Sequence, residues 1–258
     1  WNTNFVLSYY RNYYVKRDAN YVLGINETQR QDVNDMWQYV VDGMIPAGNP
    51  NAGALKFKDL NGYLRDDSGN IVMVNGKPAY SGSPDGMIDE ADMIYKGNST
   101  PIPFSLNNSF EFGKFDVNVY FYGMFNNWQN NSTYTMFAGN LQNVALYGEN
   151  TLKSLANRWS YDNLNSSIPS IFAHVESTAA QRNGYYLEKA WFLRCDNVSL
   201  GYTFKTKKSN KYFSSLRVYA AARNLFVITP YSGSDPETDS QAAYPNSRTY
   251  TFGIDITF

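Results

Sequence analysis

Two short acidic stretches hold the residues of this chain that are best suited to chemistry. The first, KDLNG, contains Asp59 and Asn61, and the second, SPDGMIDEAD, contains Asp85, Asp89 and Asp92. The DGxID spacing of the second stretch is typical of the second half of a calcium-binding loop, in which carboxylate and amide oxygens surround the cation and glycine permits a sharp turn. Together the two stretches predict a calcium site formed by Asp59, Asn61, Asp85, Asp89 and Asp92.

The insert between the acidic stretches decides whether they can meet. It runs over residues 62–82 and contains an Asn75-Gly76 pair flanked by IVMV and PAY. Asn-Gly between two such runs signals a tight hairpin, and a hairpin brings its ends together. The split loop could therefore still close around an ion. The alternative is a solvated acidic turn at the entrance to a strand, without metal.

The sequence shows no pattern of a catalytic site. There is no nucleophile elbow, no histidine-based metal site and no glycine-rich phosphate loop. His174 is the only histidine, and the only cysteine, Cys195, is best interpreted as a small buried hydrophobic residue. The 22 basic and 23 acidic side chains nearly balance, so no charge field would attract nucleic acid. We therefore expect neither an enzyme nor a nucleic-acid-binding protein.

Alternation of apolar and polar residues predicts the elements that must carry any function. In FDVNVYFYGMF, residues 115–125, Phe115 and Val117 share one face while Asp116 and Asn118 share the other. A polar strand face can be the solvated surface of a soluble sandwich or the lining of a water-filled barrel, and alternation does not separate the two. The same rhythm recurs in residues 104–112, 197–204, 216–223 and 249–258.

The lengths of the connections favour the barrel. The Gly113-Lys114 turn and the link over 205–215 are short, whereas the links over about 126–185 and 229–247 are long. Outer-membrane barrels alternate in this way between short periplasmic turns and long external loops. The 22 Tyr, 16 Phe and 5 Trp residues also suit a boundary between hydrocarbon and water.

Three further segments carry local predictions. Residues 149–159, ENTLKSLANRW, have helical spacing and predict a surface helix in the long loop. Residues 27–35 could be helical, and residues 36–41 fit a strand equally well.

Several of these segments resemble those of a known family. YYLEKAWFLRCDNVSLGYTF (185–204), LRVYAAARNLFVITPYSGSDPE (216–237) and YPNSRTYTFGIDITF (244–258) are similar to stretches from the C-terminal part of SusC/RagA-like TonB-dependent outer-membrane transporters. NRWSYDNLNSSIPSIF (157–172) and the split acidic segment resemble two further loops of that family. The chain departs from the family pattern at Cys195 and at the insert within the acidic loop.

The resemblance implies an all-β fold: antiparallel C-terminal strands of a transmembrane barrel of roughly 22 strands, with long extracellular loops and a short loop helix. Residues 1–258 would be the C-terminal part of the receptor barrel, without the plug domain or the TonB-contacting segment. Residues 59–92 would be an extracellular loop, 126–185 a long extracellular loop and 186–258 the last barrel strands. The chain would lie in the outer membrane of a Gram-negative bacterium.

The chain ends in an amphipathic strand, TYTFGIDITF. In outer-membrane barrels a terminal strand of this kind is the signal for the barrel assembly machinery, and it closes the barrel so that no edge is left unpaired in lipid. Its apolar face would contact lipid and its polar face the lumen. We assign the signal to Phe252, Ile254, Ile256 and Phe258.

The resemblance also implies a function. The complete protein would import oligosaccharides or peptides, with a SusD-like lipoprotein outside and TonB supplying energy from within. Aromatic side chains of the long loops could stack on substrate or dock the lipoprotein. The rim candidates are Trp128, Tyr134, Tyr147, Trp159 and Tyr161.

Two alternatives stay open. One is a self-contained small outer-membrane barrel that acts as a pore or adhesin. The other is a soluble, calcium-dependent carbohydrate-binding sandwich, which would explain the acidic loop and the aromatic residues but not the alternating connection lengths or the terminal phenylalanine.

Overall fold

The computed structural model describes residues 1–16, 30–131, 152–170, 184–205, 213–238, 244 and 246–258. They form two compact units. The first contains residues 1–10, 101–129 and 189–258, and the second contains residues 11–100 and 130–188.

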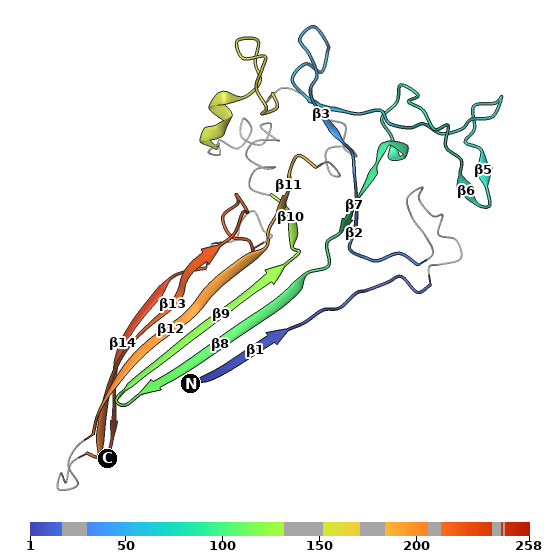
Figure 1. Cartoon of the computed structure of the whole chain (residues 1–258). Coiled ribbons are helices and arrows are strands. Elements are labelled where there is room, and N and C mark those ends of the chain that lie inside the picture. Colours follow the sequence, from blue (N-terminus) through green and yellow to red (C-terminus); the bar gives the residue numbers. More distant parts are fainter. Residues whose placement is uncertain (17–29, 132–151, 171–183, 206–212, 239–243, 245) are drawn as a thin grey trace. The chain divides into compact units, whose positions relative to one another are not determined.

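The first unit is built on one antiparallel sheet of six strands (Figure 1). The strand order is β1-β8-β9-β12-β13-β14, and each strand is hydrogen-bonded to its neighbours in this order. The sheet is open, with β1 and β14 at its edges. The strands are β1 (Asn2–Leu7), β8 (Ile102–Phe112), β9 (Phe115–Phe125), β12 (Phe192–Lys205), β13 (Ser215–Ile228) and β14 (Thr249–Thr257).

The register of these strands turns sequence alternation into two continuous faces. Val119 lies opposite Val198, which lies opposite Ala222, and Ala222 lies opposite Tyr250. Because side chains of a strand alternate between faces, this row and its neighbours two residues away form one apolar face across the sheet. The residues between them form a polar face. The predicted strands and their facing are therefore confirmed.

The connections confirm the predicted alternation as well. A two-residue turn at Gly113-Lys114 joins β8 to β9, and β12 is followed by β13 after nine residues. The long connections follow β1, β9 and β13. Because neighbouring strands run antiparallel, all three long connections leave from one end of the sheet and both short ones from the other.

The second unit contains short strand pairs and little regular structure. The pair β2–β7 and the pair β3–β4 surround a small core of Tyr39 and Met93, with Trp37 and Phe57 packed against it. A third pair, β5–β6, forms the predicted hairpin, and both turn residues, Asn75 and Gly76, have positive φ angles. Their bounds are β2 (Asp35–Gln38), β3 (Val41–Met44), β4 (Leu55–Phe57), β5 (Met73–Val74), β6 (Lys77–Pro78) and β7 (Ile94–Asn98).

The remaining described elements are short. β10 (Trp128–Asn130) pairs with β11 (Leu187–Lys189), and η1 (Glu90–Asp92) and η2 (Lys153–Asn157) are 3-10 helices. No helix among the described residues is long and apolar enough to cross a membrane.

Two helix predictions need correction. In the loop segment, only Lys153–Asn157 is helical among the described residues, and it is a 3-10 helix whose first turn has no side-chain cap. In the segment 27–35, the described residues 30–34 are not helical: they contain turns and a bridge between Asp32 and Tyr13, and Asp35 begins β2. The strand prediction for 36–41 is confirmed by β2 and the start of β3.

Candidate functional site

The hairpin insert does bring the two acidic stretches together. The Asp59 carboxylate accepts hydrogen bonds from the backbone N–H groups of Asp85, at 3.2 Å, and Gly86, at 2.6 Å. The Asn61 side-chain oxygen accepts one from the N–H of Gly82 at 2.9 Å. The first stretch thus holds the second by binding its backbone, which is the closure that the sequence predicted.

Asp92 is the centre of this loop. It is fully buried, and one of its oxygens accepts hydrogen bonds from the N–H groups of Leu60, at 2.6 Å, and Asn61, at 3.1 Å. Its other oxygen accepts from the N–H of Asp89 at 2.9 Å, while Asp89 caps η1 through the N–H of Ala91. This reciprocal arrangement is a capping box, which satisfies donors that a helix start leaves open.

The carboxylates of the acidic loop therefore bind backbone amides in this structure. Among the described residues, no group of three or more His, Cys, Asp or Glu side chains is arranged as a metal site. Burial raises the pKa of Asp89, and the charges of Asp85 and Asp92 raise it further against the opposing hydrogen bond from Ala91. A cation would relieve this repulsion, and calcium binding stays a prediction.

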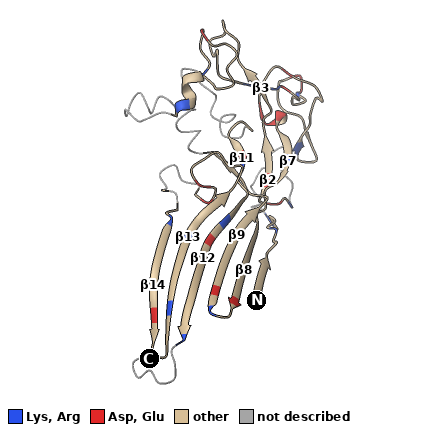
Figure 2. Ribbon diagram, turned by 60° about the vertical axis from the view of Figure 1, so that its left-hand side comes forward, with Lys and Arg blue, Asp and Glu red and all other residues tan. Residues whose placement is uncertain are grey.

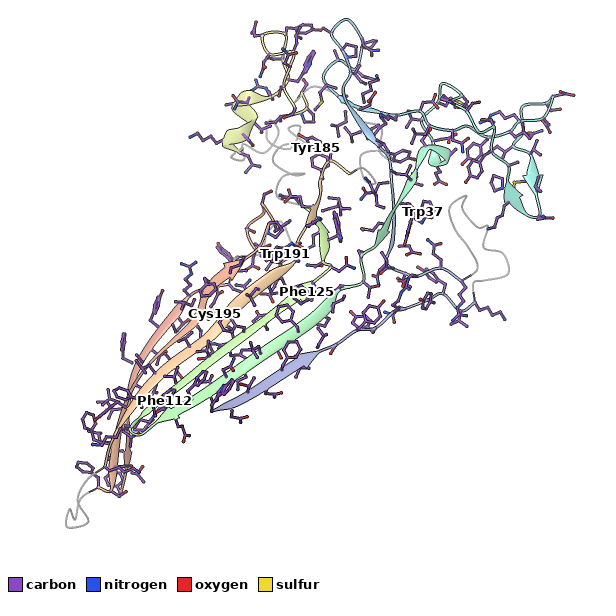
Figure 3. All side chains as sticks on the ribbon, viewed as in Figure 1. Trp37, Phe112, Phe125, Tyr185, Trp191 and Cys195 are labelled. Carbon is purple, nitrogen blue, oxygen red and sulfur yellow. The ribbon has the colours of Figure 1, made fainter. Side chains whose placement is uncertain are left out.

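The apolar face of the six-stranded sheet is open on the terminal strand. The exposed fractions of Phe252, Ile254 and Phe258 are 83%, 64% and 90%. Exposed aromatic residues lie toward both ends of the strands, as the labelled Phe112 near the hairpin and Phe125 and Trp191 toward the long connections show (Figure 3). Valine, leucine and isoleucine side chains lie among them, together with central aromatic residues such as Phe121 and Phe252. Aromatic girdles around an apolar band are typical of a barrel wall in a membrane.

The polar face carries an ordered charge ladder. Arg217 on β13 donates from Nε and Nη2 to Asp116 on β9, at 2.9 and 2.6 Å, and from Nη1 to Asp255 on β14 at 2.9 Å. Between β9 and β13 lies Gly201 of β12, and a Cβ atom there would collide with both Asp116 and Arg217. Because Gly201 has no side chain, the Arg217 guanidinium can reach across β12 to Asp116. Charged bands on β9, β13 and β14 mark this ladder (Figure 2).

A second charged cluster lies nearer the long connections. Arg194, 2% exposed, donates from Nη2 to Asp235 at 2.8 Å and from Nη1 to the side-chain oxygen of Asn224. Its Nε lies 2.5 Å from Glu237 Oε2, but the pair is not aligned as a hydrogen bond. Glu237 also accepts from the Tyr122 hydroxyl at 2.9 Å.

This Arg194 cluster escaped the sequence analysis. Residues 229–238, with their SGSDPE motif, fold back so that Asp235 and the buried Pro236 lie beside β12. An arginine near the start of β12 and a DPE turn about 40 residues later are the only signal of the pairing. The alternation of a strand does not predict which loop residue lies beside it.

The rim candidates differ in their surroundings. Trp159 is 4% exposed and packs against Gly53, so its ring belongs to the packing of the second unit. Tyr161 is 72% exposed, with its ring 5.5 Å from that of Trp159. Trp128 is half-buried under the Lys189 ammonium, at 5.7 Å. Tyr134 and Tyr147 lie outside the described residues, as does His174. Cys195 is buried, as predicted.

Comparisons with known proteins place this fold. The chain is 29% identical over 194 residues to the TonB-dependent receptor SusC of Bacteroides thetaiotaomicron, a match that covers 71% of this chain and 18% of SusC. It is 27% identical over 204 residues to the TonB-dependent receptor P26 of Formosa agariphila, covering 72% of this chain and 20% of the receptor. No protein-family model matches the chain.

Solved structures agree on the fold. The RagAB peptide importer in its open-open state matches with a TM-score of 0.56 and 24% identity, over 86% of this chain and 22% of the importer chain. The structure of the RagAB peptide transporter matches with a TM-score of 0.58 and 22% identity, over 87% and 23% of the two chains.

The mostly β, antiparallel fold matches part of the chain in the RagAB importer. The chain is homologous to the SusC/RagA type of these receptors and spans about a fifth of their length. TonB-dependent receptors are outer-membrane proteins that act in transport and are not enzymes.

Proposed function

We propose that this chain forms part of the barrel wall of an outer-membrane importer for oligosaccharides or peptides. In that importer the apolar face contacts lipid and the polar face lines the lumen. The long connections after β1, β9 and β13 lie outside the cell, where a SusD-like lipoprotein covers them. TonB drives uptake through other parts of the receptor.

One observation carries this proposal. The sheet presents a continuous apolar face that stays open on its terminal strand, while its polar face carries an ordered ladder of three charged side chains. A soluble sandwich would bury the apolar face against a second sheet, and the described residues of the first unit contain no such sheet. Homology to receptors of much greater length also disfavours a self-contained small pore or adhesin.

The experiment is uptake by cells. A strain that lacks the full-length receptor should lose import of a labelled oligosaccharide or peptide, and the receptor gene should restore it. Restoration should fail when the partner lipoprotein or TonB is deleted. Uptake that continues without TonB would contradict an active importer and favour the passive pore.

The terminal strand supports a separate prediction. Phe258→Ser should reduce the amount of folded receptor in the outer membrane several-fold, because the exposed terminal ring is proposed to be read by the assembly machinery. Heat-modifiable mobility in electrophoresis measures the folded fraction. Thr257→Ser, which changes the polar face one residue earlier, is the matched control. Normal assembly of the Phe258→Ser protein would refute the signal.

A further inference from the structure

A recess opens on the polar face where β12 and β13 lose their regular register. Its volume is about 520 Å³, which is ample for one or two sugar rings. Tyr120, Asp196, Arg223 and Asn246 are among its lining residues, and all belong to the first unit. Arg194 and its hydrogen-bond partner Asn224 line the recess, so the recess adjoins the buried Arg194 cluster.

A β-bulge creates the recess. Cys195 pairs with Phe121 and Asn197 with Tyr120, so Asp196 is an extra residue relative to β9. On β13, Cys195 pairs with Phe226 and Asn197 with Arg223, so two residues, Asn224 and Leu225, face the single Asp196. Opposite it, Asn224 adopts a left-handed conformation with φ of 50°. Bulges and left-handed residues redirect side chains and occur preferentially beside functional sites.

The arginines of the polar face are not equally paired with carboxylates. Arg194 and Arg217 each make short contacts of 2.5–2.9 Å to two carboxylates. Arg223 lies 3.6 Å from the Asp196 carboxylate, and its side chain is 66% exposed. This long contact leaves both groups with capacity for a ligand, because the guanidinium only donates hydrogen bonds and the carboxylate only accepts them.

We propose that the Arg223–Asp196 pair binds neighbouring hydroxyl groups of a neutral oligosaccharide. This inference rests on the proposed import function and names its substrate class. A hydroxyl donates and accepts, so two adjacent hydroxyls satisfy the guanidinium and the carboxylate together. The N–H and C=O of one peptide group lie in the peptide plane and point in opposite directions, so they fit such an adjacent pair less well.

Charge and shape both favour a neutral sugar. Two guanidinium groups, those of Arg194 and Arg223, meet three carboxylates, those of Asp196, Asp235 and Glu237, so the region does not attract an acidic ligand. The rings of Tyr120 and Tyr122 lie 6.1 Å apart with an interplanar angle of 27°. Such rings offer a rigid platform for the apolar face of a pyranose.

The test uses the full-length receptor purified in detergent, together with its lipoprotein if the two copurify. Isothermal titration calorimetry would measure binding of neutral hexasaccharides, namely an α-glucan, a β-glucan, a mannan and a xylan, and of a mixture of dodecapeptides. We expect one hexasaccharide to bind and to lose at least tenfold in affinity in both Arg223→Gln and Asp196→Asn. Glu111→Gln, a charge change on the same face near the hairpin, should stay within twofold.

Each other outcome contradicts the inference. Unchanged hexasaccharide affinity in both variants would show that the recess is not the site. Binding of dodecapeptides alone, weakened by Arg223→Gln, would assign the recess to peptides. No binding of any hexasaccharide to wild-type receptor would also overturn it. The proposed import function is tested independently by uptake. It is refuted if cells with the wild-type receptor take up neither labelled oligosaccharides nor labelled peptides.

Discussion

The sheet of the first unit and the acidic loop of the second unit use their carboxylates in opposite ways. On the sheet, Asp116 and Asp255 bind the guanidinium of Arg217. In the acidic loop of the second unit, Asp59 and Asp92 bind backbone N–H groups instead. The strand ladder already satisfies the backbone of the sheet, whereas a loop without a ladder must obtain acceptors from side chains. Aspartate therefore links strands across the polar face of the sheet, whereas in the acidic loop it takes the place of backbone acceptors.

The largest effect should come from removing the buried loop acceptor. Asp92→Ala leaves the N–H groups of Leu60, Asn61 and Asp89 without their acceptor, and we expect the loop to lose about 3 kcal/mol of local unfolding free energy. Hydrogen exchange of these three amides measures it.

The matched control is Asp67→Ala, a change at an exposed position of the insert between the two acidic stretches. It should leave the exchange of the three amides unchanged. Equal protection in Asp92→Ala and wild type would show that the loop does not depend on its carboxylate.

A smaller effect is expected on the sheet. Gly201→Ala places a Cβ atom against Asp116 and Arg217, so the ladder must shift, at a cost of about 2 kcal/mol. The temperature at which the receptor loses its folded electrophoretic mobility should fall. Ser199→Ala, two residues earlier on the same face, should not change it. A midpoint in Gly201→Ala equal to wild type would mean that the ladder adapts without cost.

The smallest effect concerns how the stability of the second unit depends on pH. Burial raises the pKa of Asp32, but hydrogen bonds from the Asn34 N–H, at 2.9 Å, and Arg11 Nε, at 2.8 Å, outweigh burial, so that the pKa is lowered. A carboxyl group whose pKa is lowered by folding stabilises the folded state at pH values above the pKa that it has in the unfolded chain. This contribution is lost as the pH falls through the pKa of the folded state. The raised pKa of Asp89 acts in the opposite direction, and its segment gains stability as pH falls.

Hydrogen exchange across an acidic pH series separates these two carboxyl groups. Protection of the Asn34 amide should fall on acidification, while protection of the Ala91 amide should hold or rise. Asp32→Asn should abolish the first dependence and leave the second. Parallel loss at both amides would show that a global transition, not these two groups, sets the pH response.

The sequence predicted the sheet well because a two-residue period and turn chemistry are local properties. Gly113-Lys114, Asn75-Gly76 and the alternating strands all formed as expected. The sequence did not predict contacts between residues that lie far apart along the chain. The pairing of Arg194 with Asp235 joins residues 41 positions apart, and the burial of Trp159 depends on Gly53. The acidic loop closed as predicted, but its carboxylates bind backbone amides, which ligand spacing alone could not reveal.

The most direct test of the account is which face of the sheet contacts lipid. Single tryptophans at Phe252 and Val218 on the apolar face, and at Thr251 and Tyr219 on the polar face, can be introduced into the full-length receptor in bilayers that contain brominated lipids. The change in quenching that each introduced tryptophan adds to the wild-type receptor reports its contact with the acyl chains. We predict strong quenching at residues 218 and 252 and little at 219 and 251. Equal quenching on both faces, or the reverse order, would contradict the barrel-wall interpretation.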